Sequence, residues 1–541
     1  MNKFIFFLIF ILLITTSLFT KPLRFYEKFV DITYDTSSLF SILDLKDKDG
    51  NGLIDKNSKD VYNYSFDINS DGIVSELEAK IYLRWMDIPY LIQKQFPIHV
   101  NELAQINILF QEAFKKAGSI ENITKRDLEI IRLLNLIIDT KLFELNVEVL
   151  SEVTDNQEVR NLIFESQRLK YFNETYEQSR EEFVELGNLL IQSQSIEGSY
   201  QGEINVACTT DDDLTFNYVY IPALEKEKNL IIVSSGVHGI EGHVGSALQR
   251  FYMNKLIAEY DLDNSQLGFL FIHSVNPWGY KYSRRASENN VDMNRNFDIS
   301  HELFEIQNEG YDLVTGLLNP EHKYNAKDPF FMTALLNILK YGKPALTQAI
   351  AQGQYVHSKG VFFGGKDFES QNKDVEQILL NILPSYEKVM VLDIHTAYGE
   401  RGKLHMIAMP SRDEELELIR DYIFQDVPID KPYLDPEFYT IHGGFADFVT
   451  KLCHDEVQSC MQMALEFGTL DSQTTTGAIE TVRRFVAENQ GYHNGYKGKA
   501  DEIKVKDDFR EMFYPSDRQW RLKALDQGEN VIDSVINRMS E

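Results

Sequence analysis

The chain of 541 residues contains only three cysteines, Cys208, Cys453 and Cys460. A count this small and odd excludes a scaffold held together by several disulfides, and it leaves no thiolate cluster that could bind a metal ion. A single bridge can still form if the compartment is oxidising. We expect Cys453–Cys460 to be that bridge.

Positive charge is also scarce, because 54 lysines and arginines face 83 aspartates and glutamates and the formal net charge is −29. A surface with this balance repels phosphate backbones and anionic lipid, so the composition argues against a nucleic-acid-binding protein. The acidic surplus does suit a protein that meets calcium ions.

Long hydrophobic runs are missing except at the start of the chain, where Phe4 to Ile14 is unbroken and apolar. The run follows a lysine, is short for a membrane span, and is typical of a secretory signal peptide. We therefore expect residues 1–20 to be a signal peptide, the protein to be exported to the periplasm or the outside, and no stable membrane span to remain after processing. An uncleaved anchor is the alternative, since no small-residue cleavage site precedes Lys21.

Apolar residues make up 43% of the chain, which is ample for a packed core, and the length suggests two or three domains. The distribution of apolar and charged residues changes twice along the chain. We predict a calcium-binding module over 37–85, a helical connector over 86–165 with apolar residues at helical spacing, and a catalytic domain over 166–535.

Two acidic loops lie in the first of these segments. Residues 67 to 78 carry a side-chain oxygen or a backbone carbonyl at every ligand position of an EF-hand loop, with Gly72 at the sharp turn and Glu78 as the closing bidentate ligand. The predicted calcium ligands of this loop are Asp67, Asn69, Asp71, Ile73, Ser75 and Glu78. A second set repeats the pattern at Asp47, Asp49, Asn51, Leu53 and Asp55, but Ser58 takes the closing position, so this site should be weaker. The loops start only 20 residues apart, as in compact dockerin-type repeats.

Strand-like runs alternate with helical stretches over more than 300 residues after Tyr171. This alternation predicts an α/β domain with a mixed, mostly parallel sheet and helices on both faces, preceded by the small α-helical calcium module. The predicted strands are Ile204–Ala207, Phe216–Ile221, Leu230–Val233, Leu270–His273, Val389–Ile394, Leu404–Ala408 and Met463–Phe467. Residues 300 to 360 carry no metal motif, and we expect them to form an insertion that shapes the cleft.

A histidine and a glutamate, His238 and Glu241, directly follow the apolar run Leu230–Val233 and a turn. Ligands bind where the strands of an open α/β sheet end, and Zn²⁺ accepts nitrogen and carboxylate ligands together. His395, at the end of another strand-like run, can supply the third ligand. These residues predict a zinc site with one open position for water. Glu466, a charge in an otherwise apolar strand end, is the candidate general base.

Five blocks in order resemble the signature of zinc carboxypeptidases, namely the HxxE loop, NPWGY with RR and DMNRNF, the DIHT strand end, the Y-x-x-x-G-G loop at 439–448 and the glutamate strand around Glu466. The sequence around the HxxE loop and around the NPWGY and DMNRNF motifs is similar to that of a bacterial branch of this family long known as a domain of unknown function. The resemblance implies a zinc carboxypeptidase-like fold. It also implies that Asn294 and Arg295 bind the substrate's terminal carboxylate, that Arg285 rather than Arg284 stabilises the oxyanion, and that Tyr439 contacts the substrate near the scissile amide. Phe448 replaces the family's tryptophan.

Three functions fit these residues. The first is an exported zinc metallocarboxypeptidase that cleaves an amide bond next to a free carboxylate in peptides or cell-wall peptides. The second is a deacylase of small N-acyl amino acids on the same scaffold, and the tyrosine loop favours the first over it. The third is a calcium-dependent binding protein with an inactive hydrolase domain, against which the complete set of metal, base and arginine candidates argues.

Overall fold

The computed structural model describes residues 167–540, apart from 225–227, 261, 263–265, 409–413, 426, 432–439 and 457–458, together with residues 53–54, 74–75, 116 and 164–165. The chain divides into two compact units, Met1–Arg168 and Leu169–Glu541. The predicted signal peptide and most of the calcium module and the helical connector lie outside the described residues. Within the described residues, no helix combines the length and the apolar character that a bilayer crossing requires.

In the first unit, two short strands pair with each other. β1 (Leu53–Ile54) and β2 (Val74–Ser75) are antiparallel, with Leu53 opposite Ser75 and Ile54 opposite Val74. Ile54 and Val74 occupy the same position, the eighth, in the two predicted calcium loops. The two loops are thus joined through equivalent residues.

The second unit is built on a sheet of eight strands in the order β3-β4-β6-β5-β7-β10-β8-β9. The central strands β6, β5, β7 and β10 run parallel, β3 and β4 add antiparallel pairs on one side, and β8 is antiparallel to β10 on the other. The strands are β3 (Tyr200–Asn205), β4 (Thr215–Ile221), β5 (Asn229–Ser235), β6 (Leu267–His273), β7 (Lys388–Ala397), β8 (Leu404–Ala408), β9 (Ile429–Asp430) and β10 (Ser459–Gly468).

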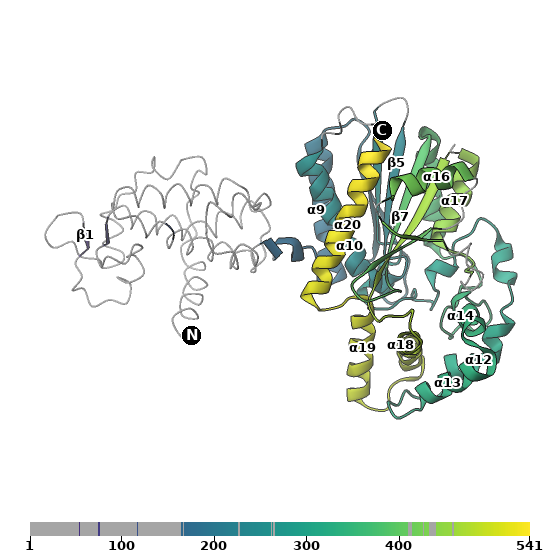
Figure 1. Ribbon diagram of the computed structural model, residues 1–541. Coiled ribbons are helices and arrows are strands. Elements are labelled where there is room, and N and C mark those ends of the chain that lie inside the picture. The colour runs from purple at the N-terminus through teal and green to yellow at the C-terminus, as the bar shows by residue number, and fades with distance from the viewer. Residues whose placement is uncertain are drawn as a thin grey trace. The chain divides into compact units, whose positions relative to one another are not determined.

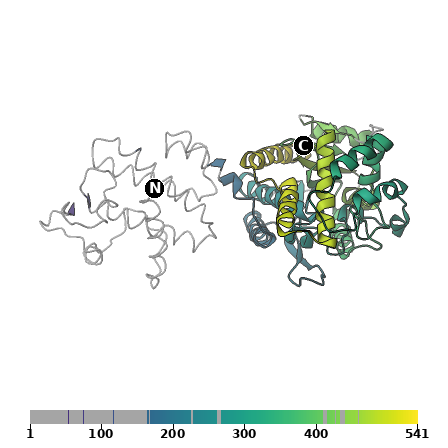
Figure 2. The ribbon, with the colours of Figure 1, turned by 90° about the horizontal axis from the view of Figure 1, so that it is seen from below.

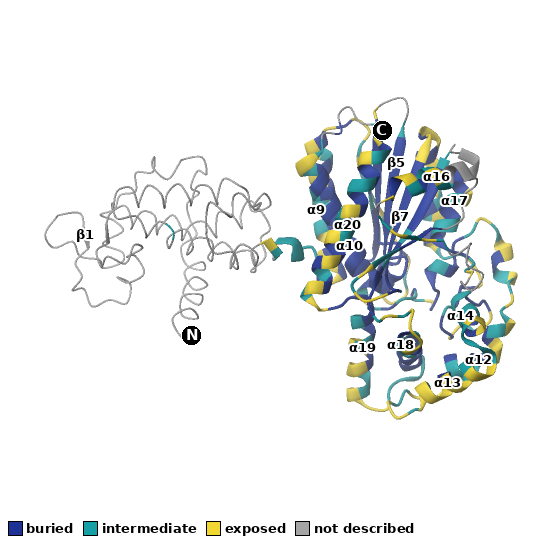
Figure 3. Ribbon diagram, viewed as in Figure 1, coloured by how far each residue is buried: buried dark blue, intermediate teal, exposed yellow. Residues whose placement is uncertain are grey.

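The central strands are continuous apolar runs because both of their faces are covered. Every residue of β5 and β6 is buried, and Figure 3 shows these strands in dark blue between outer helices that carry exposed residues. Strands of parallel sheets that are covered on both faces have this pattern, in contrast to the alternation of one-sided sheets. Burial of each large apolar side chain contributes about 1.5–3 kcal/mol, so these strands are a main source of stability.

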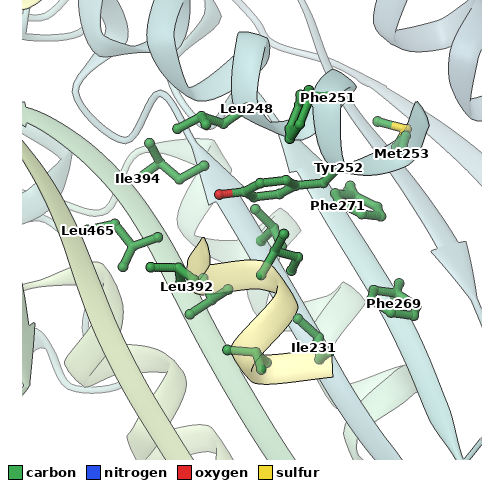
Figure 4. Packing of buried hydrophobic residues seen from close by; sticks show 14 of the residues in the cluster. Ile231, Leu248, Phe251, Tyr252, Met253, Phe269, Phe271, Leu392, Ile394 and Leu465 are labelled. Atoms are coloured by element: carbon green, nitrogen blue, oxygen red, sulfur yellow. The ribbon is translucent and has the colours of Figure 1, made fainter. Parts of the chain in front are cut away.

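Helices cover both faces of the sheet (Figure 1). One face packs against α9 (Tyr176–Gln194), α10 (Gly242–Glu259), α16 (Glu414–Ile423) and α20 (Arg518–Met539). In this layer the ring of Tyr252 lies among Leu248, Phe271 and Ile394 (Figure 4), and its hydroxyl donates to the carbonyl oxygen of Gly528. The other face packs against α11 (Pro277–Lys281), α15 (Ser370–Ile382) and α17 (Phe445–Glu456).

A third layer of helices lies at the edge of the sheet where the parallel strands end. It consists of α12 (Glu309–Leu318), α13 (Phe330–Tyr341) and α14 (Lys343–Ala351), which lie in the segment predicted to be an insertion, and of α18 (Thr475–Asn494) and α19 (Lys499–Phe513). We call α12, α13 and α14 the insertion helices. The insertion helices are the teal elements to one side of the unit in Figure 2. They share an apolar cluster with α18 and α19 that includes Tyr311, Val314, Leu346 and Phe485.

The predicted α/β class, with a mixed, mostly parallel sheet and helices on both faces, is confirmed. All seven predicted strands are present, but the first runs over Tyr200–Asn205 rather than Ile204–Ala207, and β9 was not predicted because two residues carry no periodicity. Cys453 on α17 and Cys460 on β10 form the expected disulfide, and Cys208 is a free thiol.

Candidate active site

The candidate residues meet because three neighbouring parallel strands end at the same edge of the sheet. His238 follows β5, His395 lies near the end of β7, and Glu466 lies near the end of β10. In the pairing of β7 with β10, Glu466 is directly in register with His395. Strand order therefore brings together residues that are up to 228 positions apart (466 − 238). The carboxyl ends of parallel strands are where α/β folds bind ligands.

The loop that carries His238 and Glu241 is held in place by the segment that follows β6. The backbone N–H groups of Gly239 and Ile240 donate to the carbonyl oxygens of Arg285 and Arg284, at 3.1 and 2.9 Å. A Cβ at Gly239 would lie only 2.3 Å from the backbone of Gly279, so this close approach requires glycine. Glu241 ends the loop at the N-cap of α10.

Two imidazoles converge on one carboxylate oxygen. The Oε2 atom of Glu241 lies 3.0 Å from Nδ1 of His238 and 2.8 Å from Nδ1 of His395. All three side chains are buried, and their ligand atoms lie within 4.8 Å of one another. The three residues predicted as zinc ligands are thus brought together as one compact donor set.

Each imidazole has a second carboxylate behind it. Nε2 of His395 lies 2.6 Å from Oδ2 of Asp393, whose other oxygen accepts a hydrogen bond from the hydroxyl of Ser234 at 2.7 Å. Nε2 of His238 lies 3.3 Å from Oδ1 of Asp292. Metal-binding histidines characteristically place their second nitrogen against a carboxylate, which fixes the orientation of the ring.

The pKa shifts of Glu241 and His395 indicate that positive charge is favoured within the cluster. Burial raises the pKa of Glu241, but the neighbouring His238 and His395 outweigh it and lower that pKa to about 2. Burial lowers the pKa of His395, but Asp393 and Glu241 raise it well above its usual value. A divalent cation supplies this charge without protonating the imidazoles. Two imidazole nitrogens, one carboxylate oxygen and two supporting carboxylates form a donor set that fits zinc.

Glu466 lines the same cavity and has the electrostatics of a proton acceptor. Burial raises its pKa to about 8, and the charges of His395 and Arg285 oppose that rise. Its Oε2 atom is buried and has no hydrogen-bond partner among the described residues. A carboxylate with a raised pKa and a free oxygen can take up a proton and pass it on.

The structure distinguishes between the two adjacent arginines. Arg285 lines the cavity, donates through Nε to Oδ2 of Asp292 at 2.9 Å, and lies with its Nη1 3.8 Å from Oε1 of Glu241. Arg284 points away from the cavity, where Glu488 binds it at 2.7 Å and the ring of Tyr492 lies 3.6 Å from its guanidinium carbon. Of these two arginines, only Arg285 lines the cavity.

Asn294 and Arg295 both line the cavity. The Oδ1 atom of Asn294 accepts from the N–H of Phe445, which leaves its amide nitrogen available for a ligand. Nε of Arg295 donates to the carbonyl oxygen of Ala351, at the end of α14, at 2.9 Å. Nη1 of Arg295 donates to the carbonyl oxygen of Asn294 at 2.7 Å. The insertion therefore holds the guanidinium in place.

Tyr439 lies outside the described residues, but the end of its loop is described. The N–H of Thr440 donates to Oε1 of Gln348 and its carbonyl oxygen accepts from Nε2 of the same side chain, at 2.8 and 3.1 Å. Gly443, with a φ of +69°, accepts from the N–H of Phe297, and a Cβ there would lie 2.4 Å from the carbonyl oxygen of Arg295. His442 belongs to this loop but does not line the cavity.

Of the predicted calcium ligands, Leu53 lies in β1 and Ser75 in β2. Asp47, Asp49, Asn51 and Asp55 of the first loop, and Asp67, Asn69, Asp71, Ile73 and Glu78 of the second, lie outside the described residues.

A cavity of about 920 Å³ opens from the strand ends into the helical layer. Patterns in the sequence did not identify the residues that build its wall, among them Phe362 and Phe485, whose rings lie beside the guanidinium of Arg285. The role of Asp292 behind His238 was also missed. Local patterns do not reveal a wall that is assembled from four helices, and only the aspartate had a signal, since it lies three residues before Arg295 in the DMNR motif.

The family model of DUF2817, described as a protein of unknown function, matches residues 172–527. No curated protein matches the chain.

Among solved structures, the chain is similar to bovine thrombin-activatable fibrinolysis inhibitor in complex with tick carboxypeptidase inhibitor, with 14% identity, 60% of this chain and 98% of that chain covered, and a TM-score of 0.32. Carboxypeptidase A from Helicoverpa armigera gives 12% identity, 81% and 87% coverage, and a TM-score of 0.33. Murein-tripeptide amidase from Escherichia coli O157 gives 13% identity, 57% and 96% coverage, and a TM-score of 0.26.

Proposed function

The chain belongs to the DUF2817 family, and we propose that it is a zinc-dependent hydrolase that cleaves an amide bond next to a free carboxylate, as a carboxypeptidase does. The observation that carries the proposal is the convergence of His238, Glu241 and His395 in a cavity that also contains Glu466 and Arg285. In a protein that had lost its activity, one or more of these residues would be expected to be replaced. A protein that only binds a ligand has no need of a general base such as Glu466 beside the metal ligands.

The proposed zinc ion, held by the two imidazoles and Glu241, would activate the attacking water and polarise the scissile carbonyl. Glu466 takes the proton of that water and delivers it to the nitrogen of the leaving group. The guanidinium of Arg285 donates hydrogen bonds to the oxygen on which negative charge develops. Asp292 and Asp393 orient Arg285, His238 and His395.

The substrate's carboxylate is proposed to lie against Arg295 and the amide nitrogen of Asn294. Guanidinium is suited to this contact because its planar N–H groups match the two carboxylate oxygens. Tyr439 is proposed to approach from the loop that Gln348 holds at Thr440. The same residues would serve a deacylase of N-acyl amino acids, and the two activities differ in what the acyl side of the cavity accepts.

The experiment that tests this function compares peptides that end in a free carboxylate with the same peptides ending in an amide. The zinc-loaded protein should strongly prefer the acids. Arg295→Ala should lower kcat/KM for the acids by about 10- to 100-fold, since hydrogen bonds to charged groups contribute about 1.5–3 kcal/mol, and should leave the amides nearly unchanged. Arg295→Lys keeps the charge and should retain part of the preference. An acid-to-amide ratio that is equal in wild type and Arg295→Ala would refute the role.

We further propose that the protein is exported and that its N-terminal module binds calcium. Export is supported by the apolar run at Phe4–Ile14 and by the disulfide between Cys453 and Cys460, because disulfides persist in oxidising compartments. Calcium binding is supported by the ligand pattern of the two loops and by the pairing of Ile54 with Val74, which joins them at equivalent positions.

Calcium should stabilise this module without changing catalysis. Saturation at about 100 times Kd should add roughly 2.7 kcal/mol to its free energy of unfolding, because the ion binds the folded form only. Glu78→Gln should abolish most of that gain, since it removes the bidentate ligand, whereas Ser58→Ala, at the same position of the other loop, should change little. Thermal unfolding with and without calcium checks both variants. A peptidase rate that collapsed without calcium would instead make the module a regulator.

A further inference from the structure

The cavity beyond the strand ends has a wall of markedly different chemistry from its floor. The floor is formed by the candidate catalytic residues. The wall is formed largely by apolar side chains of the insertion helices, of α18 and of the segment before α15, among them Val314, Leu317, Ile338, Phe362, Val482 and Phe485. The polar Lys343 and Thr347 of α14 line it as well. The exposed side chains of Gln473 and Thr475 also line the cavity, so it is open to solvent at these residues.

The two arginines give the cavity a direction. Arg295 is fixed by the end of α14 and lies next to the loop of Gly443. Arg285 lies beside the aromatic part of the wall, because the rings of Phe362 and Phe485 are 5.4 and 5.3 Å from its guanidinium carbon. A substrate whose carboxylate lies at Arg295 and whose scissile carbonyl lies at Arg285 would therefore place its acyl portion beside Phe362 and Phe485, which belong to the wall.

This wall offers few hydrogen bonds to a peptide. The backbone groups of α12, α13 and α18 are already bonded within these helices, and the side chains of α12 and α13 that line the cavity are hydrocarbon. Helix α18 adds the hydroxyl groups of Thr475 and Thr481, and that of Thr481 donates to the carbonyl oxygen of Gly477. A peptide backbone placed along such a wall would leave N–H and C=O groups without partners, which is costly, whereas an alkyl chain has no such groups. The volume of about 920 Å³ is that of a site for a large ligand, well beyond one small acyl group.

We propose that the acyl portion of the substrate is a long alkyl chain. The protein would then hydrolyse N-acyl amino acids that carry a fatty acyl group. The inference rests on the proposed function. Hydrolysis adds water across the amide bond: the acyl carbon gains the hydroxyl group and leaves as a fatty acid, and the nitrogen gains the hydrogen and leaves as the amine of a free amino acid. No oxidant or second substrate is needed.

The experiment measures kcat/KM of the zinc-loaded protein for N-acyl phenylalanines from acetyl through hexanoyl and decanoyl to tetradecanoyl, below their micelle-forming concentrations. We expect kcat/KM to rise by about fourfold per methylene, the factor that corresponds to ~0.8 kcal/mol per buried CH₂, until the cavity is filled. Acetyl-phenylalanine and C-terminal peptides with a polar residue before the last should be poor substrates.

A matched pair of variants tests the wall itself. Ile338→Lys places a charge inside the cavity and should abolish the preference for long chains, while Leu339→Lys, the next residue of α13 with 76% of its surface exposed, should retain it. Ala478→Trp shortens the cavity without adding charge and should move the optimum to shorter chains, which keeps the test valid if the lysine variant does not fold. Calorimetric titration of Glu466→Gln with dodecanoyl-phenylalanine measures binding without turnover.

The outcomes separate the two proposals. Peptides cleaved as well as, or better than, long-chain acyl amino acids would overturn the fatty-acyl inference and leave the hydrolase intact. A flat chain-length profile with no binding of dodecanoyl-phenylalanine to Glu466→Gln would overturn it too. The absence of hydrolysis for every acyl amino acid and peptide, despite bound zinc, would instead overturn the proposed function.

Discussion

Replacing Glu466 with glutamine should lower kcat by about 10²–10⁴-fold, the usual contribution of a general acid–base residue, while the zinc content remains that of the wild type. Glutamine keeps the size of the side chain but can neither accept the proton of the attacking water nor donate one to the leaving nitrogen. It also removes a carboxylate whose buried Oε2 atom has no partner among the described residues. The midpoint of thermal unfolding should therefore not fall.

The wild-type pH profile offers a second measurement of the same residue. Burial raises the pKa of Glu466 to about 8, and a group with a raised pKa is protonated, and so inactive as a base, below that value. A nearby cation favours the carboxylate and lowers the pKa again. The acid limb of kcat/KM should therefore fall between the ordinary carboxyl value and about 8. Glu502→Gln, a surface change on α19, serves as the control and should behave as wild type. A Glu466→Gln variant with wild-type turnover would remove this residue from the mechanism.

Replacing His395 with alanine should abolish stoichiometric zinc and reduce hydrolysis to the background rate. The residue supplies one of three protein ligands, and the two that remain cannot hold the ion against a chelator. His238→Ala should do the same. Zinc measured by mass spectrometry after dialysis against a chelator, together with the hydrolysis rate, checks both variants. His322→Ala, with 63% of its side chain exposed and outside the cavity, is the control.

Replacing Asp393, whose carboxylate contacts the imidazole of His395, should weaken zinc binding without abolishing it. Asp393→Asn leaves all three ligands in place but weakens the contact of 2.6 Å to Nε2 of His395, so zinc affinity should fall by about 10- to 100-fold rather than be lost. Stoichiometric zinc that survives the chelator in both histidine variants would sink the ligand assignment. An unchanged affinity in Asp393→Asn alone would leave the ligands and refute only the supporting role of the aspartate.

Much of the fold could be predicted from sequence because the central strands are buried on both faces and so appear as unbroken apolar runs. The convergence of His238, Glu241 and His395 followed from the same signal, since two of these runs end immediately before or at the proposed ligands and parallel neighbours end at one edge. The strand β9 gave no signal, because two residues cannot show a period.

The remainder of the site depends on contacts between distant segments. Arg284 and Arg285 are adjacent in sequence, and what separates them is Glu488 on α18, which binds Arg284 from 204 residues away. The hydrogen bond from Arg295 to the carbonyl oxygen of Ala351 could not be predicted from local sequence patterns either. The same is true of the hydrogen bond between Thr440 and Gln348. The insertion was expected to shape the cleft, but that it also positions a proposed substrate-binding arginine could not be inferred from its composition.

The division of the cavity between strand ends and helices has a practical consequence for protein engineering. The proposed zinc ligands and Glu466 are held by β5, β7 and β10, whereas the apolar wall comes largely from residues 309–351 and α18. Libraries that vary Val314, Leu317 and Ile338 would change which molecules fit without disturbing the groups that break the bond. One scaffold could thus be retuned for chosen acyl groups, provided that Gln348 and the backbone at Ala351 are kept.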